Sequence, residues 1–490
     1  MNCCKILLLI LIVSNYAFGQ KNHLQTFSKA ELLEDFDLMV NSLKEAHGGL
    51  YWYSNAVEFD SICVVQRNKI DNNTSSLAFY NLITPIITSI KEGHTNVSIS
   101  KDISNHLKAK DLYLPILTKT IDGNLFLLND IQKHKTKGYS IAAINGVPIE
   151  TVLDEILNSI PADGYITTSK FYRLNSNGFS NYYSDLYDIS KTNSLTLVHP
   201  NAKDTIALKN VKSIDSKSIR AIRTDCFKHR KGGNNLPLDL ELLNKSTGLL
   251  RLNTFEQHRF EAERGFEKIL DSLFHVVQKK NIEHLILDLR YNRGGEEHYS
   301  ALTFSYLTDA PFEQYEYVQT NAFDYSFFEH TNYNSKENRD ELLGYLNDEH
   351  DKAMDGRILR KKTVLPAPDN QENAFTGNIY VLTSGKTYSA AALFASLVRS
   401  HTNAVFVGQE TGGCYYGNTG GFRIRLTLPN SKLGIDIPLL RFVNKVDNIF
   451  PLGRGIIPHH KVEQGVEDYI LGNDKQLEFI LNLIKNDMKQ

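Results

Sequence analysis

Short apolar runs alternate with helical segments through the C-terminal half of the chain, and this alternation limits the fold more than any other feature. The runs that predict strands are 248–255, 284–289 (HLILDL), 378–383 (NIYVLT) and 404–407 (AVFV). Helical segments follow the first and third of these runs, at 259–279 and 389–399. Strands that alternate with helices form parallel sheets covered by helices. Residues 216–490 are therefore expected to form one layered α/β domain.

Two further regions precede this domain. Residues 28–31 (SKAE) form a capping box that predicts a helix start, and 57–70 and 76–90 also have helical spacing, which makes 20–100 a helical N-terminal domain. Between 101 and 215 the apolar runs are short and separated by turn sequences such as DGN and NG. This second region is expected to be a small β-rich module with one helix near 149–160.

The stretch 310–372 interrupts the alternation of strand and helix. It is charged and unusually rich in Tyr and Phe. Such a stretch is compatible with a lid or a substrate-facing insertion, and equally with an irregular packed loop. The sequence leaves both interpretations open.

The first residues have the pattern of a secretory signal peptide. Lys5 precedes the short apolar run 6–13 (ILLLILIV), and Ala17-Phe18-Gly19 places small residues at the two positions that signal peptidase reads. Cleavage is expected between Gly19 and Gln20, which makes 1–19 the signal peptide and the mature protein periplasmic or secreted. The alternative is a buried N-terminal strand. No later apolar run approaches the length of about 20 residues that crosses a bilayer, so no transmembrane anchor is expected.

Charge and cysteine content exclude several classes of protein. The 490 residues include 54 Lys and Arg against 56 Asp and Glu, so neither a nucleic-acid surface nor a polybasic membrane patch is expected. Cys3 and Cys4 leave with the signal peptide, and Cys63, Cys226 and Cys414 remain. Three widely spaced cysteines argue against a disulfide framework and a zinc cluster.

Ser389 is the first candidate for chemistry. It stands where the strand 378–383 passes through a short turn into a helix with small residues behind it. Free N–H groups and the helix dipole favour negative charge at such a position, which suits a nucleophile and the oxyanion that it generates. The alternative is that Ser389 only caps the helix.

Two other segments carry candidate groups. The strand 284–289 ends near Gly294 and Gly295, where backbone N–H groups can approach a ligand closely, although a plain turn would have the same sequence. His94 follows a helix that stops at Gly93, and histidine is the natural general base near neutral pH. A structural histidine is the alternative for His94.

Taken together, these segments resemble the tail-specific, or C-terminal-processing, serine peptidases, whose relatives include the tricorn core protease and a retinoid-binding protein. The resemblance extends from about residue 30 to 485. It is carried by the order of the segments LDLRYNRGG, TYSAA, AVFVGQETGG, EGHT and RGIIPHHKVEQGVEDYILGNDKQLEFIL.

The resemblance implies a mechanism and an architecture. It makes Ser389 the nucleophile and assigns the oxyanion hole to the N–H of Gly294 or Gly295 together with that of Ala390. It also implies a crotonase-like or ClpP-like α/β core. The stretch 138–146 resembles a divergent PDZ module, although the usual carboxylate-binding loop of that module is not visible.

Two branches of this family differ in the general base. One uses a lysine, and Cys414 stands at its position here; a thiol with a pKa of about 8.5 is a poor substitute. The tricorn-like branch uses an upstream histidine, which His94 matches. That branch has a Ser before the His where this chain has Gly93. The resemblance therefore implies a Ser389–His94 pair, and the group that orients His94 is left open among Glu92, Asp447 and Glu463.

The sequence as a whole predicts an exported serine endopeptidase that cleaves polypeptides, including C-terminal segments, without a metal or organic cofactor. Two minor alternatives are a metal site at His459-His460 and a thiol nucleophile at Cys414. The main alternative function is a catalytically impaired relative that binds a peptide or an apolar ligand. The sequence does not indicate an oligomeric state.

Overall fold

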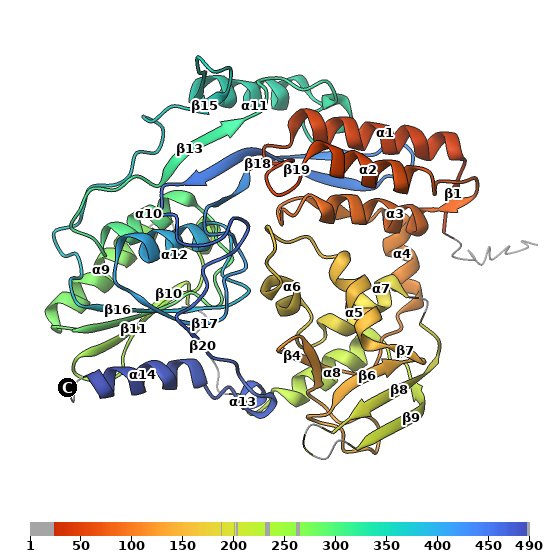
Figure 1. Ribbon diagram of the computed structural model, residues 1–490, viewed down its shortest axis with the longest axis horizontal. Coiled ribbons are helices and arrows are strands. Elements are labelled where there is room, and N and C mark those ends of the chain that lie inside the picture. Colours follow the sequence, from red (N-terminus) through yellow and green to blue (C-terminus); the bar gives the residue numbers. More distant parts are fainter. Residues whose placement is uncertain are drawn as a thin grey trace, which may run out of the picture.

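A computed structural model describes residues 24–187, 189–199, 201, 204–230, 236–260 and 265–487. The predicted signal peptide 1–19 and its cleavage point lie outside the described residues. Within them the chain forms a mixed α/β fold with three six-stranded sheets and one two-stranded sheet (Figure 1). No helix in these ranges combines the length and the apolar character that crossing a membrane requires.

The first of the large sheets, which we call the central sheet, is built from the C-terminal half of the chain. Its strand order is β10-β11-β12-β16-β17-β20; β10 pairs antiparallel with β11, and all other neighbours are parallel. The strands are β10 (Leu238–Leu242), β11 (Thr247–Leu252), β12 (His284–Asp288), β16 (Asn378–Thr383), β17 (Val405–Gly408) and β20 (His460–Lys461). The predicted strands at 248–255, 284–289, 378–383 and 404–407 are confirmed within a few residues.

Helices cover both faces of the central sheet. The connecting elements are η1 (Gln257–Arg259), α9 (Phe266–Lys279), α10 (Glu297–Ser305), α12 (Ala390–His401), α13 (Val466–Leu471) and α14 (Lys475–Asp487). Leu285, Leu287 and Val381 pack with α9, α10 and α12, whereas Ile286 and Leu382 pack with α14 on the opposite face (Figure 1). Adjacent strand residues point to opposite faces, so a run that is apolar at every position is the pattern of a strand buried on both sides.

The N-terminal helices share a hydrophobic core with a second large sheet. The N-terminal elements are β1 (Thr26–Phe27), α1 (Lys29–Ala46), α2 (Ala56–Arg67), β2 (Thr74–Ser75), α3 (Ser76–Ser89), β3 (Asn96–Ser98) and α4 (Lys101–Lys110). The capping box predicted at Ser28 and Glu31 is present at the start of α1. Leu32, Phe36 and Ile83 of these helices are buried in one cluster with residues of β13, β18 and β19.

That second sheet has the order β14-β15-β13-β19-β18, with β3 paired to β19. Its elements are β13 (Tyr315–Thr320), η3 (Phe328–His330), α11 (Lys336–Glu349), β14 (His350–Lys352), β15 (Ile358–Arg360), β18 (Gly417–Thr427) and β19 (Gly434–Asn444). The pairing of β3 with β19 joins Asn96–Ser98 to residues 434–436. This pairing brings the segment that follows His94 to the C-terminal half of the chain.

The stretch 310–372 belongs mainly to this second sheet. It supplies β13, β14, β15 and α11, and its Val318, Phe327, Phe328 and Leu346 are buried in the shared core. The sequence left two interpretations open for this stretch. Its burial in the shared core disagrees with a lid, and its strands and helix disagree with an irregular loop. The aromatic residues of the stretch are therefore mostly core residues.

Residues 111–226 form a separate β-rich layer, which lies across from the central sheet in Figure 1. The third large sheet has the order β4-β5-β6-β8-β9, with β7 paired to β6. Its elements are β4 (Thr118–Ile121), β5 (Asn124–Leu127), β6 (Ser140–Ile144), β7 (Val147–Pro148), α5 (Ile149–Asn158), α6 (Thr168–Arg173), α7 (Gly178–Leu186), β8 (Thr192–Val198), β9 (Thr205–Lys212) and α8 (Ser216–Cys226). The predicted helix near 149–160 is present as α5.

Candidate active site

Ser389 lies at the sharp turn between β16 and α12. Its backbone has φ 53° and ψ −127°, a region that side-chain-bearing residues rarely adopt. The hydroxyl makes no capping hydrogen bond to α12, so the interpretation of Ser389 as a simple helix cap is wrong. A serine held in a strained turn at a helix N-terminus presents its hydroxyl outward, which is the geometry of a nucleophile elbow.

The His94 imidazole faces this hydroxyl. His94 Nε2 lies 3.2 Å from Ser389 Oγ, although the two residues are 295 positions apart in the chain. His94 stands two residues before the start of β3, and the pairing of β3 with β19 holds it at this place. The Ser389 and His94 side chains that the sequence singled out are therefore brought together.

Glu92 holds the other side of the imidazole. Its Oε1 lies 2.7 Å from His94 Nδ1, and its Oε2 accepts the backbone N–H of His94 at 2.9 Å and that of Thr95 at 3.0 Å. Because a carboxylate accepts hydrogen bonds, neutral His94 carries its proton on Nδ1 and turns the Nε2 lone pair to Ser389. Of the three carboxylates left open by the sequence, Glu92 is the one that contacts His94.

A second buried histidine supports Glu92. His47 Nδ1 accepts the backbone N–H of Gly49 at 3.0 Å, so its proton lies on Nε2, 2.7 Å from Thr95 Oγ1. The Thr95 hydroxyl in turn donates to Glu92 Oε2 at 3.0 Å. Burial lowers the pKa of His47 to about 4, so His47 is neutral at neutral pH and this chain of hydrogen bonds keeps one direction.

Asp163 and Tyr388 complete the cluster. The fully buried Asp163 accepts the N–H of Gly93 at 2.8 Å and the Tyr388 hydroxyl at 2.8 Å through the same oxygen, Oδ1. The Tyr388 hydroxyl oxygen also lies 3.1 Å from His94 Nδ1. Two buried carboxylates, those of Glu92 and Asp163, therefore flank one imidazole.

The charges in this cluster shift one another's pKa values. Burial alone would lower the pKa of His94, but the negative charge of Glu92 and its hydrogen bond outweigh burial and raise it. Burial alone would raise the pKa of Glu92, but the charge of His94 holds it below its ordinary value. Burial, together with the charge of Glu92, raises the pKa of Asp163 to about 6. The imidazole therefore has a stronger affinity for a proton than an ordinary histidine.

Backbone N–H groups gather beside Ser389. A Cβ added to Gly294 would lie 2.8 Å from the Ala390 nitrogen, so the glycine turn packs directly on the start of α12. The Gly294 N–H donates to Asn292 Oδ1 at 2.8 Å. Within the described ranges no acceptor is found for the N–H groups of Gly295 and Ala390. These two, rather than Gly294, are the groups available to a ligand.

The remaining sequence candidates have other surroundings. Cys414 is buried, and burial together with the charge of Asp163 raises its pKa well above the ordinary value, which disfavours a thiolate. Within the described residues no hydrogen bond or ion pair joins the Asp447 carboxylate to His94, and the Asp447 backbone N–H donates to the Ser400 hydroxyl at 2.9 Å. Glu463 accepts from the Gln409 side chain at 2.7 Å.

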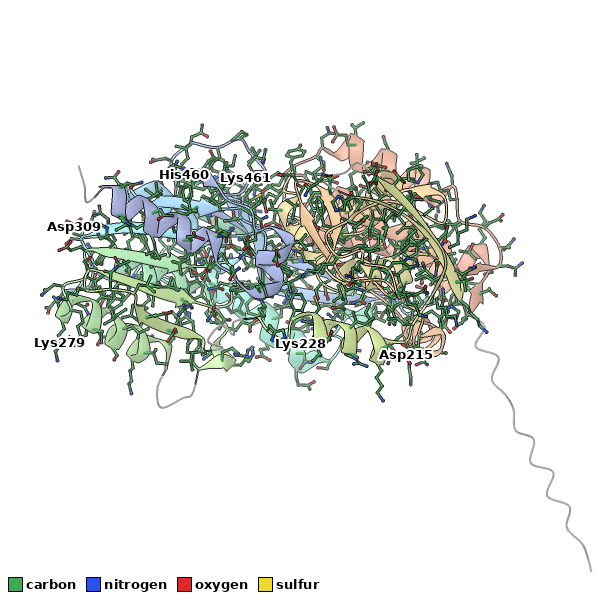
Figure 2. All side chains as sticks on the ribbon, turned by 90° about the horizontal axis from the view of Figure 1, so that it is seen from below. Asp215, Lys228, Lys279, Asp309, His460 and Lys461 are labelled. Carbon is green, nitrogen blue, oxygen red and sulfur yellow. The ribbon has the colours of Figure 1, made fainter. Side chains whose placement is uncertain are left out.

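The His459–His460 pair lies at the start of β20, the edge strand of the central sheet. Nδ1 of His459 accepts the N–H of Phe406 at 2.9 Å. His460 and Lys461 lie together near the edge of the molecule in Figure 2. In the described part of the chain, the group of three whose ligand atoms come within 4.8 Å of one another is instead Glu92, His94 and Asp163, and these side chains already bond each other or Tyr388.

A cavity of about 1210 Å³ opens in front of Ser389. The β-rich layer contributes residues of α6 and α7 to one wall, and the glycine turn and the start of α12 form the other. Charged side chains from both walls line it, namely Arg173, Asp185, Glu256, Arg293, Glu296, Lys386 and Arg423. This size accommodates an extended segment of several residues.

The comparison with known proteins agrees with this geometry. Residues 246–462 match the sequence model of peptidase family S41. The C-terminal half of the chain thus contains a region of this family, and the resemblance to the tail-specific serine peptidases stated from the sequence is confirmed. By this match the chain is a serine-type peptidase.

Solved structures of mature CPAF share the fold. Mature CPAF superposes with a TM-score of 0.61 at 17% identity, covering 94% of this chain and 98% of CPAF. Its complex with lactacystin gives a TM-score of 0.62 at 16% identity, covering 94% and 99%. The photosystem II D1 C-terminal processing protease is more distant, with a TM-score of 0.40 at 13% identity over 92% and 98% of the two chains.

Four residues of the cluster around His94 were not predicted from the sequence, namely His47, Thr95, Asp163 and Tyr388. Thr95 and Tyr388 are direct neighbours of His94 and Ser389, so adjacency was the available sign for them. Asp163 sits in a PADG turn that reads like any loop, and His47 is one of 16 histidines. For these two residues only the fold supplies the information.

Proposed function

We propose that this chain is an exported serine endopeptidase in which Ser389 is the nucleophile and His94 the general base. The observation that carries the proposal is the 3.2 Å approach of His94 Nε2 to Ser389 Oγ, with Glu92 on the far side of the imidazole. Nucleophile, base and orienting carboxylate stand in the order that acyl transfer requires.

In the proposed reaction the Ser389 hydroxyl attacks the scissile carbonyl carbon while its proton moves to His94 Nε2. The imidazolium that forms is stabilised by Glu92, and it returns the proton to the leaving amine, which leaves an acyl-enzyme. A water molecule, deprotonated by the same imidazole, then releases Ser389. The raised pKa of His94 favours the first proton transfer.

The N–H groups of Gly295 and Ala390 are proposed to hold the oxyanion. Ala390 directly follows Ser389, Gly295 lines the same cavity as Ser389, and the N–H groups of both lack an acceptor within the described residues. Loss of one such donor typically lowers turnover by about two to three orders of magnitude. The occupied N–H of Gly294 is left out of this role.

The substrate is proposed to be a polypeptide in extended form, because the cavity in front of Ser389 has a volume of about 1210 Å³ and is lined by polar and charged side chains. Residues 101–215, which include most of the β-rich layer, are proposed to act as a PDZ-like module beside a crotonase-like or ClpP-like core, 216–490, with 20–100 as the helical N-terminal domain. Export rests on the signal-peptide pattern that ends at Gly19.

A fluorophosphonate probe tests the nucleophile. We expect wild-type protein to be labelled, Ser389→Ala to be unlabelled, and His94→Ala to be labelled at least about a hundredfold more slowly. Hydrolysis of an unfolded protein substrate should follow the same order. A wild-type chain that is neither labelled nor active would instead support a ligand-binding protein.

The cavity itself argues against an apolar ligand in that alternative. Seven charged side chains line it, and burying a charge against an apolar molecule is unfavourable. A peptide remains the ligand whose polar backbone and side chains match such walls.

A further inference from the structure

The Tyr388 side chain occupies the space beside Gly93. A Cβ added to Gly93 would lie 2.4 Å from the Tyr388 hydroxyl oxygen and 3.1 Å from Asp163 Oδ1. The first contact is too close for any side chain at position 93 while Tyr388 keeps its hydroxyl, whereas the second requires only a small shift. Gly93 does not have the positive φ that favours glycine, so its missing side chain is a matter of space rather than of backbone conformation.

The hydrogen bonds of Tyr388 have a defined direction. Asp163 Oδ1 accepts from Tyr388 at 2.8 Å, so the phenol proton points to Asp163 and an oxygen lone pair faces His94 Nδ1 at 3.1 Å. Burial, together with the charges of Asp163 and Glu92, raises the pKa of Tyr388 well above its ordinary value and keeps the phenol protonated. Tyr388 therefore adds a second acceptor to Nδ1, beside Glu92.

The imidazole ring is held by packing as well. The rings of His94 and Tyr388 lie 4.9 Å apart, centre to centre, at an interplanar angle of 32°. Tyr388 directly precedes Ser389, so its backbone is part of the turn that holds the Ser389 hydroxyl. The same residue thus connects the turn of the nucleophile to the ring of the base.

We propose that Tyr388 is a positioning residue of this site, whose hydroxyl, seated in the space that Gly93 leaves open, links His94 to Asp163 and fixes the tautomer and orientation of the imidazole. The catalytic consequence rests on the proposed function, whereas the link itself is a property of the folded chain.

The test changes which residue supplies the hydroxyl group next to His94 Nδ1. Tyr388→Phe removes it, and Gly93→Ser in the Tyr388→Phe background offers a new one from the opposite side. The matched control is Gly93→Ala in the same background, which adds the same Cβ without the oxygen. We expect Tyr388→Phe to lower kcat about tenfold with KM little changed, since one hydrogen bond to the charged imidazole is lost.

Rescue distinguishes positioning from packing. Gly93→Ser/Tyr388→Phe should recover at least about threefold in kcat over Tyr388→Phe, and Gly93→Ala/Tyr388→Phe should recover nothing. Gly93→Ser alone should lose activity, because its Cβ displaces the phenol. Equal activity of the two double variants, or full activity of Tyr388→Phe, would overturn the proposal. If Tyr388→Phe alone does not fold, the two double variants, which fill the gap, still decide.

A measurement without turnover separates this proposal from the proposed function. The Nδ1 proton of His94, assigned through its loss in His94→Ala, should give a downfield proton resonance in the wild type. We expect that resonance to shift in Tyr388→Phe and to return towards its original position with Gly93→Ser but not with Gly93→Ala. An unchanged resonance would overturn the positioning role, whether or not the chain cleaves peptides.

Discussion

The protonation of His94 is set by the groups that surround it. Glu92, Asp163 and Tyr388 accept or share hydrogen bonds at or near Nδ1, while Arg423 acts in the opposite direction through its positive charge. His47, the other nearby imidazole, is neutral at neutral pH. The balance favours the imidazolium, so the pKa of His94 lies above its ordinary value of 6.5.

This balance predicts the pH dependence of activity. Because a general base must be unprotonated, kcat/KM should fall as the pH drops through the raised pKa of His94. Glu92→Gln removes the negative charge that raises the pKa of His94 and leaves the effect of burial, which lowers it. The acidic limb of the kcat/KM profile should therefore move to lower pH, and the plateau of kcat/KM should fall by at least about tenfold. Profiles of kcat/KM between pH 5 and about 9 measure both. An acidic limb that stays in place would contradict the assignment of Glu92.

Replacement of Cys414, unlike that of Glu92, is expected to leave activity largely unchanged. Its thiol is buried beside Asp163, and burial keeps its pKa far above neutral pH. Cys414→Ala should therefore retain kcat within about threefold of the wild type and should still be labelled by the fluorophosphonate. A loss to background, in a variant with an unchanged circular dichroism spectrum, would move the nucleophile or base to this loop.

The residues of the proposed active site were only partly predictable from the sequence. The resemblance to the peptidase family identified Ser389, His94, Gly295 and Ala390, because they lie in segments whose order along the chain is recognisable. Asp163 was not predicted because its role depends on a contact with Gly93, which is 70 positions away. Hydrogen bonds between distant segments leave no periodic pattern in the sequence.

At the scale of elements, the turn from β16 to α12 carries the strain of the site. Ser389 has φ 53° there, yet the flanking strand and the buried, mostly apolar face of α12 are well packed. Packing of the two neighbours therefore holds an unfavourable conformation between them, as in other sites that need an exposed nucleophile.

This strain predicts a difference between two inactive variants. Ser389→Gly accepts the positive φ, whereas Ser389→Ala keeps the strain, so the glycine variant should be more stable to urea by about 1 kcal/mol despite its larger unfolded-state entropy. Urea unfolding of both variants measures the difference. Because neither has a nucleophile, equal or reversed stabilities would show that the turn is not strained.

The strands differ in how well the sequence predicted them. β12 and β16 have apolar or aromatic residues at every interior position and were predicted almost to the residue, because both faces of the central sheet are buried. β18 and β19 were not predicted. β18 is glycine-rich at its start and carries exposed arginines, and β19 pairs not only with β18 but also with β13 and β3, which come from other regions. Pairing with distant strands, rather than local pattern, decides those two.

At the scale of the whole molecule, three distant regions meet behind the site. The N–H of Gly164 donates to the Lys91 carbonyl at 2.8 Å, and the N–H of Tyr165 donates to the Gly453 carbonyl at 2.8 Å. The N-terminal helices, the β-rich layer and the C-terminal region therefore touch at one turn. Asp163, which bonds Gly93 and Tyr388, directly precedes this turn.

Gly164 is the position where this junction can be tested. Its φ is 54°, and a Cβ there would lie 2.2 Å from the Gly453 carbonyl oxygen. Gly146 is the matched control, since its φ is 81° and a Cβ there would meet nothing within 4 Å. Both alanine variants carry backbone strain of about 1 kcal/mol, but only Gly164→Ala must also push two regions apart.

We therefore expect Gly164→Ala to lower the thermal midpoint clearly more than Gly146→Ala and to lower kcat as well, because displacement of Asp163 loosens the link through Tyr388 to His94. Gly146→Ala should keep nearly full kcat, since the β6–β7 turn lies outside the cavity lining. Thermal unfolding and peptide hydrolysis of the two variants provide the measurements. If the two variants lose the same stability and keep the same kcat, the junction does not hold the site, and the positions of His94 and Ser389 must be maintained by the β3–β19 pairing alone.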